Sequence, residues 1–201
     1  MNIALWVTQV VLAFAFIAAG GMKVKQLSRW MAPGILRQDQ VAPIGTIIAY
    51  SDGKSGWLAL PPPQGLIPMP APVLKQAQGE IFREWFSLVL SDRDATRTVN
   101  AVAPNAVDIS TAEGESVRVE FDEATGLPMR QMYKETGMGG PPSEVKETYS
   151  DWREVSGIKL PFKALIEQNG KKSGEAAISE IKLNTGIKAD ELSKKPEPAK
   201  K

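Results

Sequence analysis

Apolar and polar residues alternate along most of the chain from Arg37 onward. Val117, Val119 and Phe121 share one face of an extended segment, while Arg118 and Glu120 take the other face. A period of two is typical of β-strands that bury one face. Comparable runs span residues 45–50, 56–60, 98–103, 107–111, 129–135, 145–152, 158–167 and 177–183. Turn residues such as glycine, asparagine and aspartate separate these runs, so the pattern predicts an antiparallel meander of hairpins.

One segment follows the period of a helix instead. Its apolar residues recur every three or four positions, at Leu74, Ala77, Ile81, Trp85 and Leu88. Pro72 suits a first helical turn and Ser91-Asp92 ends the run, so we expect a helix at about residues 72–91 that covers one face of the sheet. Residues 60–72 hold six prolines and are predicted to form an ordered connecting loop.

The N-terminal residues 3–22 form a run of 20 residues without a charge. A helix of that length matches the hydrocarbon core of a bilayer, so the run predicts a membrane anchor. A buried core helix and a cleaved signal peptide are the alternatives, the latter favoured by the small residues Ala18-Ala19-Gly20. Lys23, Lys25 and Arg29 follow the run and favour a cytoplasmic position for the rest of the chain.

These patterns divide the chain into four parts. Residues 1–25 are an anchor or uncleaved signal, 26–36 a linker and 37–187 the β domain. Residues 188–201 are charged and poor in apolar side chains, which predicts a disordered tail.

The composition excludes several classes of function. The 24 basic and 23 acidic residues nearly cancel, so the chain lacks the positive field of a nucleic-acid binder. Histidine and cysteine are both absent, which removes the commonest general base, the thiolate nucleophile and the usual ligands of zinc, haem and iron–sulfur clusters. We therefore expect no enzyme activity, no cofactor and no metal site.

The most specific string in the chain is YSDWREVSGIKLPFK at residues 149–163. It resembles a strand–turn–strand of bacterial outer-membrane lipoprotein-sorting proteins of the LolA-like type, and of related β domains appended to insulinase-type zinc peptidases. The supporting pieces are Phe121-Asp122, residues 125–128, residues 179–184, Asp52-Gly53 and Gly56-Trp57. Together they cover about residues 35–195.

The resemblance implies a mainly β (α+β) fold. It consists of a curved antiparallel sheet, an unclosed barrel, whose concave apolar side is covered by a helix and can hold acyl chains. The early helix and first strands of the family would precede Arg37, where this chain has its apolar run, so we expect those first strands to be missing.

The first 25 residues carry a second resemblance. They end in AGGMK and are similar to the first membrane helix of DoxX-like proteins. Those proteins have several such helices and this chain has one, so the resemblance implies a fused leader and no shared function.

Five apolar side chains are candidates for a ligand groove, because large aromatic and thioether surfaces suit flexible lipid chains. They are Trp57, Met69, Ile81, Trp85 and Phe86. Packing in the core is the alternative role for each of them.

Two functional hypotheses follow. The first is a membrane-anchored, non-catalytic module that binds a lipid or the acyl chain of a lipoprotein. The LolA-like resemblance places it on the periplasmic side of the bacterial inner membrane, against the orientation that the three basic residues favour. The second is an accessory domain of a cell-envelope complex that binds a protein partner and no small ligand.

Overall fold

The computed structural model describes residues 8–14, 26–136 and 141–196, and the side chains discussed below lie between residues 28 and 196. The described residues form one sheet of 13 strands. The strands are β1 (Thr8–Phe14), β2 (Gln26–Ala32), β3 (Ile35–Ala42), β4 (Gly45–Ser51), β5 (Gly56–Leu60), β6 (Gly65–Pro68), β7 (Arg97–Ala103), β8 (Ala106–Thr111), β9 (Ser116–Phe121), β10 (Pro128–Thr136), β11 (Pro142–Val155), β12 (Ile158–Gln168) and β13 (Lys171–Leu183).

The sheet consists of two meanders that meet in its middle. The strand order is β6-β5-β4-β3-β2-β1-β13-β12-β11-β10-β9-β8-β7, and every neighbouring pair is antiparallel. The pairing of β1 with β13 joins the first meander to the second. Strands β6 and β7 remain as the two edges, so the predicted unclosed antiparallel architecture is confirmed.

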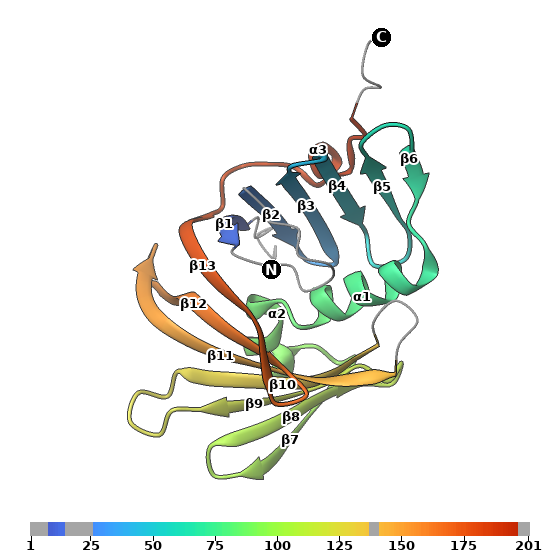
Figure 1. Ribbon diagram of the computed structural model, residues 1–201. Coiled ribbons are helices and arrows are strands. Elements are labelled where there is room, and N and C mark those ends of the chain that lie inside the picture. Colours follow the sequence, from blue (N-terminus) through green and yellow to red (C-terminus); the bar gives the residue numbers. More distant parts are fainter. Residues whose placement is uncertain (1–7, 15–25, 137–140, 197–201) are drawn as a thin grey trace.

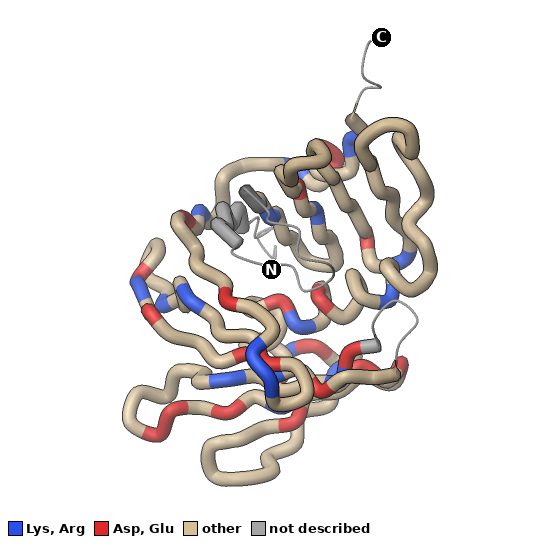
Figure 2. Tube along the Cα trace, in the orientation of Figure 1, with Lys and Arg blue, Asp and Glu red and all other residues tan. Residues whose placement is uncertain are grey.

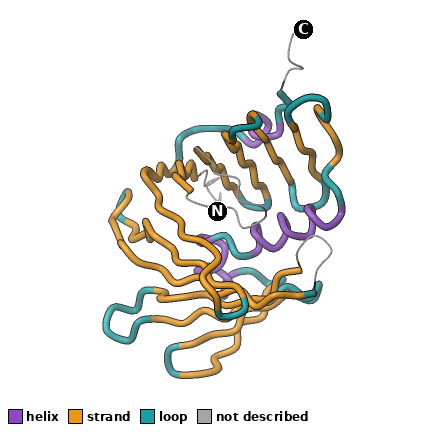
Figure 3. Tube along the Cα trace, in the orientation of Figure 1, coloured by secondary structure: helices purple, strands orange, loops and turns teal. Residues whose placement is uncertain are grey.

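The helices lie inside the curve of the sheet, between the two meanders (Figures 1 and 3). They are α1 (Ala71–Phe82), α2 (Trp85–Val89) and the short 3-10 helix η1 (Ser91–Arg93). The single helix predicted for residues 72–91 is therefore divided. The break follows from Glu84, whose carboxylate accepts hydrogen bonds from the backbone N–H groups of Phe86 and Ser87 and so starts a new helix.

Helix α1 packs against both meanders. Its residues Leu74, Ala77 and Ile81 join Met31 and Leu36 in one apolar cluster. At the other end of the helix layer, apolar side chains pack on the second meander; this cluster is formed by Phe82, Leu88, Ile109, Val117 and Val119. The helix layer therefore covers the inner face of the sheet and separates its two halves.

The N-terminal prediction is wrong where the structure can be compared with it. Residues 8–14, in the middle of the predicted membrane helix, form β1 and pair with β2 and β13. A continuous apolar run fits either a helix or a strand buried in a sheet, and here the unpaired edges of two meanders favour the strand. The described residues contain no helix with the length and apolarity needed to span a membrane. Residues 1–7 and 15–25 of the predicted anchor lie outside the described part.

The predicted linker and the missing first strands are corrected in the same way. Residues 26–32 form β2, so β1 and β2 precede Arg37 where strands were expected to be absent. The proline-rich connector also contains a strand, β6, which uses Gly65–Pro68 at the edge of the sheet, where proline is tolerated.

The start of the predicted disordered tail is ordered. Residues Ala189–Ser193 form helix α3, because Leu192 is only 3% exposed against the sheet. Arg37 adds to this contact by donating to the carbonyl oxygens of Leu192 and Lys194 at 3.1 and 3.0 Å. Residues 197–201 lie outside the described part of the chain.

Candidate functional site

A cavity of about 130 Å³ lies between α1 and strands β3 and β4. Its apolar wall is formed by Leu36, Ala49, Met69, Val73 and Ala77. Its polar lining residues are Gln38, Tyr50, Ser51, Gln76 and Glu80. The alternation of β3 and β4 sends Leu36 and Ala49 inward, while the helical spacing of Val73 and Ala77 places both on the face of α1 that meets the sheet.

An ion pair lies at the polar side of this cavity. The Arg29 guanidinium on β2 donates from Nη2 to Glu80 Oε2 at 2.5 Å and to Gln38 Oε1 at 3.1 Å. About a quarter of each charged side chain is exposed, so the pair is mostly buried and solvent screens it only in part. The pair does hold α1 in register over β2 and β3.

Three aromatic rings form a second inner feature at the start of α2. The Trp85 ring lies 5.4 Å from Tyr149 in an edge-on arrangement and 5.6 Å from Trp152. Asp151 has a left-handed backbone (φ 56°) that interrupts the regular alternation between Tyr149 and Trp152. The two rings consequently lie 6.5 Å apart although three positions separate the residues. All three side chains are half-buried and extend the apolar inner surface beyond the cavity.

A polar cluster on β10 and β11 lies beside the aromatic rings. The Glu147 carboxylate accepts hydrogen bonds from Tyr133 Oη at 2.7 Å, Gln131 Nε2 at 3.0 Å and Tyr149 Oη at 3.1 Å. Burial, followed by the negative charge of Glu147, raises the pKa of both tyrosines well above the usual value. Because protein donors occupy both oxygens of Glu147, this carboxylate holds the two strands together and is not free to act as a base.

Arg83 connects this cluster to the helix layer. Its guanidinium carbon lies 3.6 Å from the centre of the Tyr133 ring, a close cation–π contact. A Cβ at Gly79 would come within 2.8 Å of Arg83 Nη1, so the glycine leaves room for this arginine against α1. Burial raises the pKa of nearby Glu135, while the positive charge of Arg83 opposes that shift.

The structure brings some of the predicted groove residues together and separates others. Met69 lines the cavity, and Ile81 packs in the same apolar cluster. Trp85 lies in the aromatic group, and Phe86 is half-buried next to it on α2. Trp57 belongs to the opposite face of the sheet, because Trp57 packs in the cluster under α3 whereas the following residue on β5 packs in the cluster under α1.

On that outer face, four side chains form a row across four strands. The register pairs Trp30 with Arg37, Arg37 with Tyr50, and Tyr50 with Trp57. The Tyr50 and Trp57 rings stack with centres 5.6 Å apart, and Arg37 lies 5.8 Å from the Trp30 ring and 5.9 Å from the Trp57 ring. A pocket of about 480 Å³ opens beside this row and is bounded by β6 and by Ser193 and Lys195. Trp57 is therefore a core side chain that also lines an outer pocket.

Sequence reasoning missed the polar part of the inner surface. Arg83, Gln131 and Glu147 carry no distinguishing motif, and the contact of Arg83 with Tyr133 joins the helix layer to a strand 50 residues further along the chain. Tyr149 and Trp152 had a signal, because both belong to the string at residues 149–163 on which the LolA-like resemblance rests.

Solved structures with the same arrangement belong to lipoprotein-sorting and related proteins. A putative outer membrane lipoprotein-sorting protein domain from Vibrio parahaemolyticus has 12% identity and a TM-score of 0.51, with 94% of this chain and 88% of that chain covered. A LolA superfamily protein from Nitrosomonas europaea has 12% identity and a TM-score of 0.55, with 95% and 90% covered. The chain has a LolA-like fold.

A third solved structure has a similar fold. A DUF1329 family protein from Desulfovibrio piger has 10% identity and a TM-score of 0.54, with 94% of this chain and 89% of that chain covered. No family model matches the sequence, and no curated protein is significantly similar to it. The resemblance predicted from residues 149–163 is thus confirmed at the level of the fold, which by itself leaves the ligand open.

Proposed function

We propose that this LolA-like domain is a non-catalytic binding module for an apolar ligand, such as the acyl chain of a lipid or of a lipoprotein. The observation that carries the proposal is the cavity of about 130 Å³ between α1 and the inner face of the sheet, with its wall of Leu36, Ala49, Met69, Val73 and Ala77. Ligand sites of this kind are concave and mainly apolar, with a few polar groups that set orientation. Glu80 and Gln38 are such groups here.

The size of the cavity sets a condition on binding. Buried apolar cavities of about 150 Å³ accept a molecule as large as benzene. A cavity of about 130 Å³ therefore takes the end of an acyl chain, and a longer chain requires α1 to move away from the sheet. Such movement would have to break the Arg29–Glu80 pair and the hydrogen bond from Gln78 Nε2 to the Gly53 carbonyl oxygen.

The alternative function is an accessory domain that binds another protein and no small ligand. Two observations favour it: the small size of the inner cavity, and the uncovered strand edge β7, whose residues are almost all exposed. Under this alternative the side chains along α1 and α2 serve only as core.

We also propose a location on the periplasmic side of the bacterial inner membrane. The LolA-like fold supports this location. Residues 8–14 belong to the folded sheet as β1, so removal of residues 3–22 as a leader would also remove this strand. A reporter enzyme fused after Lys201 should be active outside the cytoplasm. Activity confined to the cytoplasm would contradict the location.

Ligand binding is tested by filling the cavity. In Ala77→Leu the added carbons fill the cavity from the side of α1. The stability of the ligand-free protein should therefore be unchanged or higher, while the ligand can no longer enter the cavity. Ala71→Leu makes the same change on the exposed start of α1 and is the matched control. Melting temperatures of the three proteins are compared with and without palmitate, and native mass spectrometry reports lipid that copurifies.

We expect palmitate at about 100 times its dissociation constant to stabilise the wild type by about 2.7 kcal/mol, which corresponds to roughly 5–10 °C for a chain of this size. Ala71→Leu should show the same shift and Ala77→Leu little or none. Trp85→Ala should show a reduced shift, because an acyl chain longer than the cavity would extend onto the inner aromatic group that Trp85 forms with Tyr149 and Trp152. The absence of a shift and of copurified lipid in the wild type would reject the proposal in favour of the accessory domain.

A further inference from the structure

Strand β7 forms an open edge of the sheet. Within the part of the chain that the structure describes, β7 pairs with β8 alone, so one side of its backbone has no partner strand. Six of its seven residues are exposed, including Val99 at 40%. Figure 1 shows β7 at the free margin of the second meander. An edge of this length presents a row of N–H and C=O groups that can accept another strand.

The sequence of β7 lacks the features that normally protect such an edge. Charged residues and proline are both absent from residues 98–103, and Figure 2 shows the β7–β8 hairpin with hardly any charge along β7. Natural edge strands are usually protected by lysine, proline or inward-pointing charges. The one charged residue of β7, Arg97, does not serve this purpose.

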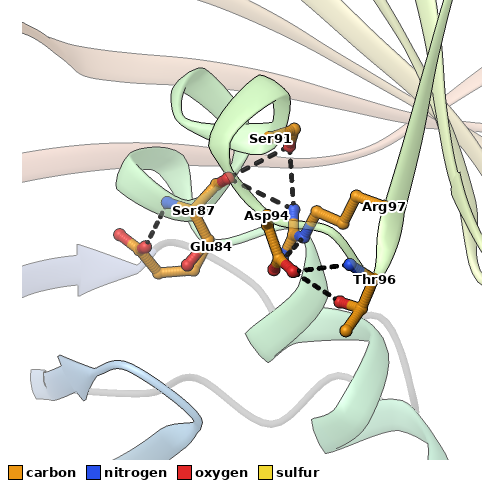
Figure 4. Close-up of polar contacts among 6 residues, drawn as sticks. All are labelled: Glu84, Ser87, Ser91, Asp94, Thr96 and Arg97. Atoms are coloured by element: carbon orange, nitrogen blue, oxygen red, sulfur yellow. Dashed lines mark hydrogen bonds and ion pairs between the residues drawn. The ribbon is translucent and has the colours of Figure 1, made fainter.

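Arg97 is turned back into the protein (Figure 4). Its side chain is 9% exposed and pairs with Asp94 at 3.3 Å. It also donates to Ser91 Oγ at 3.1 Å and to the carbonyl oxygen of Ser87 at 3.3 Å. These contacts fix the start of β7 to α2 and η1, and they withdraw the positive charge from the edge.

The other edge of the sheet is protected. Strand β6 has only four residues, ends at Pro68, and is preceded by three consecutive prolines at residues 61–63. Proline removes backbone donors and limits pairing. The contrast between the two edges singles out β7 as the one suited to pairing with another strand.

The residues beside β7 define which kind of strand can be added to this edge. On the inner face, Val99 lies opposite Ile109, which belongs to the core, so the added strand needs an apolar residue there. On the outer face, Asn100 lies opposite Asp108, whose charge is already neutralised by two contacts to Arg118 at 2.7 and 2.8 Å. The added strand should therefore alternate apolar and uncharged polar residues and contain no proline.

We propose that this strand is β7 of a second copy of the chain, paired antiparallel about a twofold axis. The segment Thr98-Val99-Asn100-Ala101 has the required alternation, and the regular part of β7 ends at Ala101, where its register with β8 shifts. With the axis near Val99, the two Val99 side chains face each other on the inner side, and Thr98 of each copy faces Asn100 of the other.

Symmetry and charge both support this pairing. An edge that pairs with itself about a twofold axis closes as a dimer, whereas pairing of β7 with β6 of the next copy would continue into an open chain. The net charge of the chain is +1, so two copies repel one another only weakly. The resulting interface is a continuous sheet across two molecules and is independent of the inner cavity.

Sedimentation equilibrium of the full chain tests the proposal. The wild type should show a concentration-dependent equilibrium between monomer and dimer. Val99→Lys, which puts a charge on the exposed edge, should weaken the dimer at least tenfold. Leu66→Lys is the matched control, since Leu66 is 46% exposed on the other edge strand, and it should leave the equilibrium unchanged. Circular dichroism confirms that each variant remains folded.

Cross-linking provides a second readout, because the chain has no cysteine of its own. Val99→Cys should form a disulfide-linked dimer under mild oxidation, and Leu66→Cys should not. A wild type that stays monomeric at all concentrations would overturn the proposal and leave the edge to a strand of another protein. Unchanged dimerisation of Val99→Lys, or cross-linking only through Leu66→Cys, would overturn it as well.

Discussion

The three tyrosines should make the fold sensitive to alkaline pH. Burial raises the pKa of Tyr133 and Tyr149, and the negative charge of Glu147 raises both further. Burial followed by the charge of Asp52 raises the pKa of Tyr50, against a hydrogen bond from Ser193 that lowers it. In the unfolded chain each tyrosine ionises near pH 10. The folded protein therefore keeps protons that the unfolded chain releases once the pH exceeds about 10.

The sign and size of the effect follow from that difference. The stabilising contribution is complete below about pH 10 and decreases as the pH rises toward the folded pKa values, because the unfolded state binds fewer protons. One tyrosine that ionises only after unfolding costs about 1 kcal/mol between pH 10 and 11. Tyr133 and Tyr149 together should lower the free energy of unfolding by about 2 kcal/mol over this interval, and Tyr50 should add a smaller amount.

Urea unfolding followed by far-ultraviolet circular dichroism at several pH values measures this slope. Tyr133 and Tyr149 should contribute about equally to the fall of the free energy of unfolding between pH 10 and 11. Tyr133→Phe and Tyr149→Phe should therefore each remove about half of that fall, independently of their effect on stability at neutral pH. Tyr50→Phe is the control and should change the slope less. Tyrosinate absorbance gives the refuting result: if all three residues ionise near pH 10 while the protein is still folded, the burial argument is incorrect.

Two further substitutions test contacts that position the outer and inner faces. Arg37→Met removes the hydrogen bonds to the carbonyl oxygens of Leu192 and Lys194, so the free energy of unfolding should fall by about 2 kcal/mol and α3 should exchange its amide hydrogens faster; unchanged exchange would refute the role of Arg37. Gly56→Ala places a Cβ 2.5 Å from the Tyr50 carbonyl oxygen and should cost about 1–3 kcal/mol, whereas an unchanged urea midpoint would show that this contact is readily relieved.

The second meander was predictable because its information is local. Strands such as β8 and β9 alternate apolar and polar residues and are joined by a turn, so the period of two reveals both the strand and its buried face. Strands β7 to β13 lie side by side in chain order, so each antiparallel pair joins strands that are close in the sequence. The string at residues 149–163 predicted the fold through its resemblance to LolA-like proteins, and the solved structures confirm that fold.

The apolar N-terminal run was ambiguous for a physical reason. A sequence that is apolar at every position has no period, so it satisfies a membrane helix and a strand buried in a sheet equally well. Residues 8–14 form a strand because β2 and β13 leave unpaired backbone groups on both sides of them. Strand β2 follows β1 closely, whereas β13 lies near the other end of the chain. The N-terminal sequence therefore does not indicate the pairing with β13.

The candidate site depends on the same kind of distant contact. Alternation along β5 requires Trp57 and Leu58 to point to opposite faces, which the sequence alone establishes. The docking of the helix layer decides which of these two residues points toward α1. The layer docks on the side of Leu58. Leu192 is the one large apolar residue in a charged segment, and it is buried because Tyr50 and Trp57 provide a surface for it. Local pattern thus determined the strands and their two faces, while contacts between distant residues determined which face became the inner surface, because burial is a property of neighbours that the local sequence does not specify.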